Sequence, residues 1–445
     1  MKSGTIYAPA SGGGPAGVAV LRVSGPRAGE AWRRLAGGPL PVPRRLVRVR
    51  LSDPAAGEAL DDGLGAWFPG PASFTGEDVV EFHVHGGRAV VAAVLAALKG
   101  IEGLRLAEPG EFTRRAFENG KMDLTAAEGL ADLVAAETAA QRRQALRQMQ
   151  GVLGALYEEW RRDLLGGLAH VEAAIDFADE EVPEGLIDDV RRRAASLRDA
   201  MRGHLADGRR GERLRDGVHV AIIGPPNAGK SSLLNALARR DAAIVSETAG
   251  TTRDVIEVHL DLGGIPVVVA DTAGLRDGGD AIECEGVRRA AARAAEADLR
   301  IAVFDATRWP DANDRTARLV DGDTMVLINK ADVATPRPPL AVGGIEAYAI
   351  SVRTGHGMEG LVERLAAAVA ARCPALEAPA MTRARHREAL EECVGALGRF
   401  VDGGSAPELA AEELRLATRA LGRITGRVDV EDMLDVIFRD FCIGK

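Results

Sequence analysis

The sequence predicts a multidomain protein of the α+β and α/β classes, in which a P-loop α/β domain is inserted into a discontinuous all-α domain. Residues 1–119 mix short β-like runs with Gly and Pro turns, which favours an N-terminal α+β domain. Residues 120–215 and 376–445 are rich in Ala, Leu, Glu and Arg and have few strand signals, so they form the two halves of a helical domain. Between them, residues 216–375 alternate β-type and helical runs, which is typical of a parallel sheet covered by helices.

The elements of the N-terminal domain follow from residue alternation and turn residues. Residues 18–23 and 78–85 are predicted strands, the second ending at a Gly-Gly pair, and the Ala-, Leu- and Val-rich residues 89–99 are a predicted helix. In the helical domain, apolar residues from Leu146 to Trp160 recur every three or four positions. The predicted strands of the α/β domain are 218–223, 265–270, 299–305, 324–328 and 347–351.

Composition excludes several classes of protein. The net charge is −9, which argues against nucleic-acid binding through bulk charge. No run of about 18 uncharged apolar residues occurs, so no membrane span is expected. The first residues lack an apolar leader core, and we expect a cytoplasmic protein. The four cysteines are scattered without a CxxC pair, which disfavours a disulfide framework or a structural zinc site.

A phosphate-binding loop follows the first strand of the α/β domain. Residues 224–231 read GPPNAGKS, which matches GxxxxGK[ST] between a strand and a helix. The glycines let backbone N–H groups surround phosphates at a helix N-terminus. Lys230 would then contact the β and γ phosphates, and Ser231 would bind Mg²⁺.

Four further motifs complete a GTPase pattern, and one of them selects guanine over adenine. Asn329-Lys330-Ala331-Asp332 ends a β run, and the Asp332 carboxylate can accept from guanine N1–H and its 2-amino group. Adenine lacks this donor pair, which disfavours a P-loop ATPase. Residues 271–274 (DTAG), Thr251-Thr252 and residues 351–353 (SVR) fit the other GTPase motifs in order and spacing.

Leu275 departs from the pattern of Ras-like enzymes, in which a glutamine at this place orients the attacking water. Leucine cannot hydrogen-bond to water. Either the domain hydrolyses GTP slowly and acts as a switch, or Glu283 or Glu285, with Arg276 as a charge stabiliser, takes over this role.

At this point the chain resembles the MnmE (TrmE) family of tRNA modification GTPases, within the TrmE-Era-like GTPases. The resemblance covers essentially the whole chain. It is carried by the P-loop with Asn227 and by residues 271–275, with the further motifs TAGTTRD at 248–254, FCIGK at 441–445, YAPA at 7–10, FTGED at 74–78 and PGEFT at 109–113. One departure is Ser351-Val352-Arg353 in place of the commoner Ser-Ala-Lys, which puts the stacking of Arg353 on guanine in doubt.

The resemblance implies an architecture and an activity. Residues 1–119 would be a folate-binding and dimerisation domain, and residues 216–375 a G domain inserted into the helical domain, whose second half ends in the CIGK motif. The protein would be a homodimer whose G domains pair in a K⁺-dependent way and hydrolyse GTP to GDP and phosphate. With the flavoprotein MnmG it would add an aminomethyl or carboxymethylaminomethyl group to C5 of the wobble uridine of certain tRNAs, using a tetrahydrofolate one-carbon unit.

The resemblance also assigns the metal and catalytic residues of the G domain. Asn227 would ligate K⁺ through its side chain, and Ser246, Thr248 and Thr251 through backbone carbonyls. Ser231 and Thr252 would ligate Mg²⁺, and Glu283 would hold the hydrolytic water, which removes the difficulty at Leu275. The complete predicted GTP-binding set is Asn227, Ala228, Gly229, Lys230, Ser231, Ser232, Ser246, Glu247, Thr248, Ala249, Gly250, Thr251, Thr252, Asp271, Thr272, Ala273, Gly274, Asn329, Lys330, Asp332, Ser351, Val352 and Arg353.

For 5-formyltetrahydrofolate or a related tetrahydrofolate, the matching positions are Arg22, Glu81, Lys121 and Lys445. A carboxylate such as Glu81 can pair with the 2-amino and ring N–H edge of a pterin, and cationic side chains suit the glutamyl tail. Lys445 reaches this site only if the C-terminal segment packs against an N-terminal domain, its own or a partner's. Cys442 fits a role near the folate site and a role as a buried chain-end residue equally well.

One alternative remains, a non-catalytic GTP switch or ribosome-assembly factor related to other TrmE-Era GTPases. Such proteins usually append a nucleic-acid module such as a KH domain, and no GXXG-type KH signal follows residue 375. The sequence leaves open which tRNAs are modified, which one-carbon donor is used, and how the paired G domains sit at rest.

Overall fold

The computed structural model describes residues 4–176, 185–207, 209–240, 242–244, 257–271, 296–309, 314–334, 340–373, 379–403, 406–428, 431–439, 441 and 444. Residues 271, 314–315 and 431–433 are described by their backbone only. The chain divides into two compact units. Unit 1 comprises residues 1–131, 148–197 and 392–445, and unit 2 comprises residues 132–147 and 198–391.

Unit 1 begins with a six-stranded sheet in the order β3-β4-β5-β2-β1-β6. All neighbouring strands are antiparallel except β1 and β6, which are parallel. Its elements are β1 (Thr5–Pro9), β2 (Ala16–Ser24), α1 (Ala28–Leu35), β3 (Val47–Ser52), β4 (Ala59–Phe68), β5 (Val79–Gly86), α2 (Arg88–Lys99), β6 (Leu104–Leu106) and α3 (Glu111–Glu118).

The two faces of this sheet differ because side chains alternate along each strand. Leu21, Val23 and Phe82 belong to the core cluster shared with α1 and α2, where Trp32 stacks on Phe82 at a centroid distance of 5.8 Å. Alternate residues such as Arg22 therefore lie on the opposite face. Part of that face is covered by α3, whose Phe112 belongs to a small buried cluster with β1.

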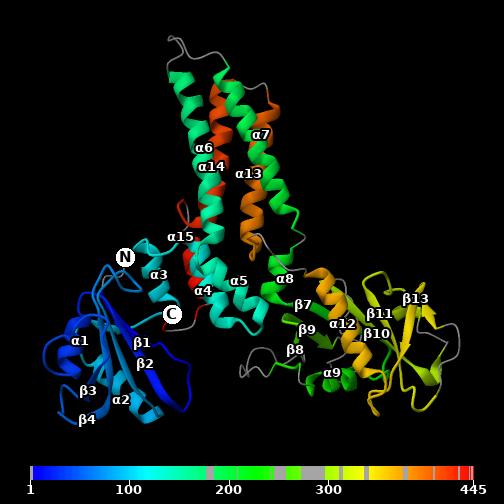
Figure 1. Ribbon diagram of the computed structural model, residues 1–445, viewed down its shortest axis with the longest axis horizontal. Helices are drawn as coiled ribbons and strands as arrows, with labels where there is room; N and C mark the ends of the chain where they lie inside the picture. The colour runs from blue at the N-terminus through cyan, green and yellow to red at the C-terminus, as the bar shows by residue number, and fades with distance from the viewer. Residues whose placement is uncertain are drawn as a thin grey trace, which may run out of the picture. The chain divides into compact units, whose positions relative to one another are not determined.

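The helices of unit 1 come from both halves of the predicted helical domain, and α6 and α14 lie side by side (Figure 1). Thr425 donates to Glu158 at 2.8 Å, and Arg415 pairs with Glu172 at 2.9 Å, so polar contacts join these two helices at both ends. No helix in the part of the chain that the structure describes is long and apolar enough to cross a membrane. Besides α1, α2 and α3, the helices that lie wholly or partly in unit 1 are α4 (Leu124–Ala135), α5 (Ala139–Met149), α6 (Val152–Asp176), α7 (Leu186–Leu205), α13 (Ala384–Asp402), α14 (Pro407–Thr425) and α15 (Glu431–Arg439).

The C-terminal end of the chain returns to the N-terminal domain of the same molecule. Phe438 of α15 and Phe441 are buried with Leu124 of α4, and Gly110 lies so close to Phe438 that a Cβ at Gly110 would be 2.5 Å from its carbonyl oxygen. A Cβ at Gly444 would lie 1.8 Å from the carbonyl oxygen of Pro9 in β1. Only glycine fits there, and its φ of +99° also favours glycine.

Unit 2 is built on a seven-stranded sheet in the order β12-β13-β11-β10-β7-β9-β8. The five inner strands are parallel, and β12 and β8 join the edges antiparallel. The inner strands are buried on both faces, as their apolar runs predict. The elements are α8 (Arg210–Asp216), β7 (Val218–Ile223), α9 (Lys230–Ala238), β8 (Glu257–Leu262), β9 (Ile265–Asp271), β10 (Leu299–Asp305), the 3₁₀ helix η1 (Ala306–Arg308), α11 (Asp314–Ala317), β11 (Thr324–Asn329), β12 (Ala341–Val342), β13 (Ile345–Ala349) and α12 (Met358–Arg372).

The predicted fold class is confirmed, and the predicted strands lie within a few residues of the observed ones. The predicted strands did not include β1, β3, β4 and β6 of unit 1 or β8 and β12 of unit 2. In β8, polar His259 and Asp261 alternate with buried Val258 and Leu260. This alternation is typical of an edge strand, whereas the predicted strands of this sheet were identified by continuous apolar runs. The predicted domain limits remain a prediction, because the compact units divide the chain elsewhere, at 131/132, 147/148, 197/198 and 391/392.

Candidate functional site

The phosphate-binding loop lies at the carboxyl end of β7, in the middle of the parallel sheet, with β9 on one side and β10 on the other. Two glycines allow the backbone to pass close to its neighbours. A Cβ at Gly224 would lie 2.3 Å from the carbonyl oxygen of Val303, and one at Gly229 would lie 2.2 Å from Nδ2 of Asn329. Both have positive φ, so the sequence requires glycine here for space and for conformation.

Lys230 opens α9 and folds back over the loop. Its Nζ donates to the carbonyl oxygens of Gly224 at 2.9 Å and Pro225 at 3.0 Å, and the side chain is buried. The ammonium group therefore lies within the phosphate-binding loop, against its backbone carbonyl groups. Positive charge together with the N-terminus of α9 makes this a place for an anion such as a polyphosphate.

Asn227 stands at the tip of the same loop. Its φ is +62°, a left-handed conformation that asparagine tolerates better than most residues. It is exposed. Its amide oxygen is a neutral ligand of the kind that suits a weakly hydrated monovalent cation, so the residue fits the K⁺ role assigned to it by resemblance.

The guanine-selecting motif is tied to the phosphate-binding loop by one buried side chain. Asn329, at the end of β11, donates from Nδ2 to the carbonyl oxygen of Ala228 at 2.9 Å. Its Oδ1 accepts from the backbone N–H of Val352 at 3.1 Å. Asn329 thus joins three loops that are far apart in sequence, and it is 3% exposed, so these bonds are shielded from water.

Asp332 is held by residues of the last motif. Its Oδ1 accepts from the Ser351 hydroxyl at 2.6 Å, and its Oδ2 lies 2.8 Å from the Arg353 guanidinium. The hydrogen bond from Ser351 and the nearby Arg353 keep the pKa of Asp332 below its ordinary value. The carboxylate is therefore ionised at neutral pH and ready to accept two N–H groups, which is the requirement for reading guanine.

The predicted GTP-site residues that fall within the described residues come together at this one edge of the sheet. They are Asn227, Ala228, Gly229, Lys230, Ser231, Ser232, Asn329, Lys330, Asp332, Ser351, Val352 and Arg353. Asp271 ends β9 beside Ile222 of β7, and only its backbone is described. Outside the described residues lie Ser246, Glu247, Thr248, Ala249, Gly250, Thr251, Thr252, Thr272, Ala273, Gly274, Glu283, Cys442 and Lys445.

A second group of predicted residues lies on the sheet of unit 1. Arg22 of β2 and Glu81 of β5 are paired in register, and Arg22 Nε donates to Glu81 Oε1 at 2.9 Å. The guanidinium carbon lies 5.1 Å from the ring centre of Phe74 and 5.8 Å from that of Phe112. His83 Nε2 is 3.5 Å from Glu81 Oε2. An ion pair beside two aromatic rings offers polar and stacking contacts to a flat heteroaromatic ligand.

Lys121 and the C-terminal segment each contact residues of the N-terminal domain. Lys121 Nζ donates to the carbonyl oxygen of Pro71 at 2.9 Å, three residues before Phe74 in the chain. Gly444 lies against Pro9. Ala8, which precedes Pro9 in β1, pairs with Arg22 of β2 across the sheet. The condition set for Lys445, that the C-terminal segment packs against an N-terminal domain, is met within one molecule up to Gly444.

Sequence reasoning missed two features of these sites. Phe74 and Phe112 were noted only as parts of motifs. Their position beside Arg22 depends on how the segment between β4 and β5, which carries Phe74, and α3, which carries Phe112, fold against the sheet. Asp305 was not considered, although its Oδ2 lies 2.6 Å from Lys330 Nζ. A signal for Asp305 did exist, because it ends a predicted strand, and ligands bind at the carboxyl ends of parallel strands.

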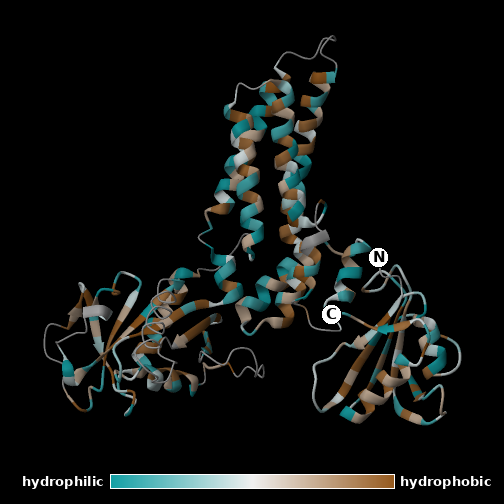
Figure 2. Cartoon of the chain, turned by 180° about the vertical axis from the view of Figure 1, so that it is seen from behind, coloured by the Kyte–Doolittle hydropathy of each residue, from teal (hydrophilic) through white to brown (hydrophobic). Residues whose placement is uncertain are grey.

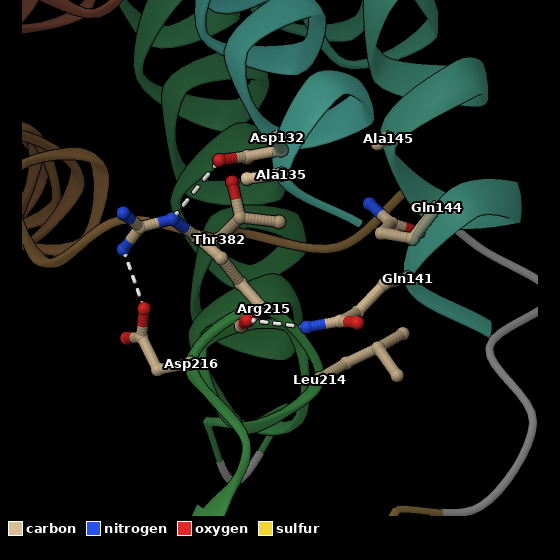
Figure 3. A pocket seen from close by; sticks show the side chains of 9 residues that line it. All are labelled: Asp132, Ala135, Gln141, Gln144, Ala145, Leu214, Arg215, Asp216 and Thr382. Atoms are coloured by element: carbon tan, nitrogen blue, oxygen red, sulfur yellow. Dashed lines mark hydrogen bonds and ion pairs between the residues drawn. The ribbon is translucent and has the colours of Figure 1, made fainter. Parts of the chain in front are cut away.

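A small cavity of about 110 Å³ in unit 2 lies where the chain enters and leaves the inserted domain (Figure 3). Asp132 of α4 accepts from Arg215 Nε at 3.1 Å, just before β7, and from Arg383 at 2.6 Å, after α12. Gln141 of α5 donates to the carbonyl oxygen of Arg215 at 2.9 Å. The backbone N–H of Ala140 donates to the carbonyl oxygen of Gly264, in the turn between β8 and β9. The cavity is small and its charged groups are paired with one another, so it marks an anchoring point of the inserted domain.

Comparisons with known proteins cover the whole chain. The family model described as the MnmE helical domain matches residues 124–442, and that of the GTP-binding protein TrmE N-terminus matches residues 5–121. The chain is 60% identical to a tRNA modification GTPase MnmE of Paramagnetospirillum magneticum, over 100% of both chains. It is 59% identical to that of Parvibaculum lavamentivorans, over 99% of this chain and 100% of the relative. It is also 50% identical to the mitochondrial 5-taurinomethyluridine-[tRNA] synthase subunit GTPB3 of Danio rerio, over 99% of this chain and 93% of the relative.

Proposed function

The chain belongs to the MnmE family of tRNA modification GTPases, and from this premise we propose that it binds GTP at the edge formed by β7, β10 and β11 and hydrolyses it in the service of tRNA modification. The observation that carries the proposal is the guanine-reading carboxylate. Asp332 is ionised and held by Ser351 and Arg353, while Asn329 ties its loop to the phosphate-binding loop. A site arranged before its ligand arrives loses little entropy on binding.

The test exchanges the base preference. Asp332→Asn should weaken GTP binding about 100-fold or more, because a donor replaces one acceptor. The same variant should gain affinity for xanthosine triphosphate, whose C2 oxygen needs a donor. Isothermal titration with both nucleotides, and with ATP as a negative control, measures the exchange. Unchanged GTP affinity would show that Asp332 does not read the base.

For hydrolysis we propose a K⁺-dependent mechanism with Mg²⁺ on the phosphates. Asn227 would hold K⁺, together with carbonyl groups of Ser246, Thr248 and Thr251, and Ser231 and Thr252 would hold Mg²⁺. A cation at this place stabilises the charge that develops on the transferred phosphoryl group. The left-handed, exposed Asn227 and the position of Ser231 at the start of α9 support these roles.

Rates of GTP hydrolysis in KCl and in NaCl test the role of K⁺ separately from the role of Glu283. The parent protein should hydrolyse GTP about 100-fold faster in KCl, and Asn227→Ala should lose that difference. Glu283→Ala should keep GTP affinity and the K⁺ effect on G-domain pairing but lose turnover, because Glu283 would position water only after assembly. Equal rates of the parent in the two salts contradict the cation role. Normal turnover of Glu283→Ala would transfer the water-positioning role to Glu285 or Arg276.

We further propose that the face around Arg22 and Glu81 binds 5-formyltetrahydrofolate or a related tetrahydrofolate, with Lys121 and Lys445 contacting its acidic tail. The ion pair, the Phe74 and Phe112 rings and the return of the C-terminus to β1 support this site. Glu81→Ala should abolish folate binding in a fluorescence titration and leave GTP affinity unchanged. Retained folate binding would place the ligand elsewhere.

The tRNA reaction itself is the last part of the proposal. The zebrafish relative is named as a subunit of a synthase that modifies a tRNA uridine, which supports action on a uridine together with a second protein. We propose a homodimer that works with the flavoprotein MnmG in the cytoplasm and installs aminomethyl or carboxymethylaminomethyl groups at C5 of the wobble uridine. Nucleoside analysis of tRNA from cells lacking this protein tests the claim, with wild-type and Glu283→Ala proteins as the complementing pair.

A further inference from the structure

Lys330 of the guanine-selecting motif is held by a residue outside the five GTPase motifs. Its Nζ lies 2.6 Å from Oδ2 of Asp305, at the end of the neighbouring strand β10. Asp305 of β10 is paired in register with Asn329 of β11, so both residues lie at the carboxyl-terminal edge of the sheet, next to Lys330. Lys330 has a φ of +66°, a left-handed conformation that is unfavourable for a non-glycine residue.

Asp305 is itself fixed in position. Its Oδ1 accepts from the backbone N–H of Thr307 at 2.9 Å and from the Thr307 hydroxyl at 2.7 Å, which caps the 3₁₀ helix η1. Beyond it, Trp309 packs edge-on against Phe304 at a centroid distance of 5.9 Å. Burial opposes the ionisation of Asp305, but the hydrogen bonds from Lys330 and Thr307 outweigh this effect and lower its pKa. The carboxylate is therefore a charged, anchored partner at neutral pH.

This arrangement changes which part of Lys330 is available to a ligand. A lysine whose backbone is fixed at one end and whose ammonium group is fixed at the other presents its four methylene groups as an apolar surface. The ammonium group is engaged by Asp305. The methylene stem then stands at the edge where Asp332 would accept the N–H groups of guanine, and a purine ring has apolar faces that suit such a surface.

We propose that Asp305 is a positioning residue for guanine nucleotides, which acts by holding Lys330 so that the lysine stem forms one wall of the base site. This inference rests on the proposed GTP binding and adds Asp305 and the 3₁₀ helix η1 that it caps to the nucleotide site. Asp305 touches neither base nor phosphate in this account, and its whole effect on binding passes through Lys330.

A double-mutant cycle tests this dependence. Asp305→Asn should raise the dissociation constants of GDP and GTP about tenfold and raise the GDP dissociation rate similarly, because an ion pair becomes a weaker bond between the ammonium group and a neutral amide. The rate of hydrolysis at saturating GTP should stay within about twofold, since positioning affects binding rather than the phosphoryl group. In the Lys330→Met background, where an apolar stem needs no anchor, Asp305→Asn should change GDP affinity by less than about twofold.

The control is Asp321→Asn. Asp321 lies near the opposite end of β10 and accepts from Arg300 at 2.7 Å and from the Thr324 hydroxyl at 3.0 Å, so it combines an ion pair with a threonine contact as Asp305 does. This variant should bind GDP like the parent. If Asp305→Asn binds GDP like the parent, or loses as much affinity in the Lys330→Met background as in the parent background, the positioning role is wrong. A parent protein that binds no GDP contradicts the proposed function instead.

Discussion

The two sheets of the molecule place their chemistry in different ways. The parallel sheet of unit 2 gathers Lys230, Asn329 and Asp332 in loops at the carboxyl ends of its strands. The antiparallel sheet of unit 1 carries Arg22 and Glu81 in the middle of its strands, side by side on one face. Figure 2 colours the same strands by hydropathy and shows polar residues interrupting the apolar ones in unit 1.

The difference follows from strand connectivity. Parallel strands all end at the same edge, so any polar residue that follows an apolar run is delivered to one place. Antiparallel strands end alternately at opposite edges, and only cross-strand register brings two side chains together. A site of the first kind is tied to short local motifs, whereas a site of the second kind depends on pairing between distant segments.

The largest effect is expected where one side chain joins the loops of the parallel edge. Asn329→Ala removes the bonds to Ala228 and Val352 and leaves buried polar groups unpaired, so GDP affinity should fall about 100-fold or more. Titration with a fluorescent GDP analogue measures the change. The matched control is Asn119→Ala, which removes an amide contact to the Thr75 carbonyl in unit 1 and should leave GDP affinity unchanged. Equal losses in both variants would mean that the edge is not specially dependent on Asn329.

A smaller loss of affinity is expected for folate at the face around Arg22 and Glu81, because several side chains there would each contribute to binding. Arg22→Gln breaks the pair with Glu81 and removes the cation beside Phe74, and folate affinity should fall about 10-fold to 100-fold. GTP affinity should not change. Arg48→Gln, at a position on edge strand β3 whose side chain is 82% exposed, is the control and should bind folate normally. Loss of GTP binding in Arg22→Gln would break the separation of the two sites.

A pH effect should distinguish the units further. Glu111 at the start of α3 accepts from Arg105 at 2.7 Å and from Arg115 at 2.9 Å. Burial raises its pKa, but these bonds and the backbone N–H of Glu108 outweigh burial, and the net pKa is lowered. A lowered folded-state pKa stabilises the fold above the ordinary glutamate value, and this stability is lost as pH falls through the folded value. The protection factors of the α3 amides, which are corrected for the intrinsic exchange rate at each pH, should therefore fall about tenfold below pH 4 in the parent and little in Glu111→Gln, which is already destabilised at pH 7.

The smallest effect is expected at Thr113 of α3. Its hydroxyl is fully buried and has no hydrogen-bond partner among the described residues. Thr113→Val replaces an unsatisfied polar atom by a methyl group of similar size, so stability should be unchanged or rise by up to about 1 kcal/mol. Thermal unfolding of the variant checks this, with Thr75→Val as the contrasting case, because Thr75 is buried and hydrogen-bonded to Ser24. A destabilised Thr113→Val would mean that the hydroxyl has a partner.

The comparison also explains how much the sequence could predict. The strands of the parallel sheet and the loops after β7 and β11 follow from apolar runs and short motifs, because each is local. Edge strand β8 was missed because its alternation lacks the apolar run of an inner strand. Only family resemblance predicted that Arg22, Glu81 and Lys121 share a site, since no local pattern fixes which strands are neighbours. The structure pairs Arg22 with Glu81 across β2 and β5. Asp305 was not predicted, although it ends a predicted strand, because its contact with Lys330 depends on the register between β10 and β11.

The anchoring of the inserted domain at Asp132 has a consequence for how such a chain arises. Arg215, just before β7, and Arg383, just before α13, both reach one carboxylate oxygen of Asp132, so the chain enters and leaves the domain at a single place. A gene for a self-contained GTPase could have been introduced between two neighbouring positions of a helical ancestor without separating the helices on either side. The same geometry predicts that residues 217–381 can be exchanged as one segment for those of a relative, provided that Arg215, Arg383 and Asp132 are kept.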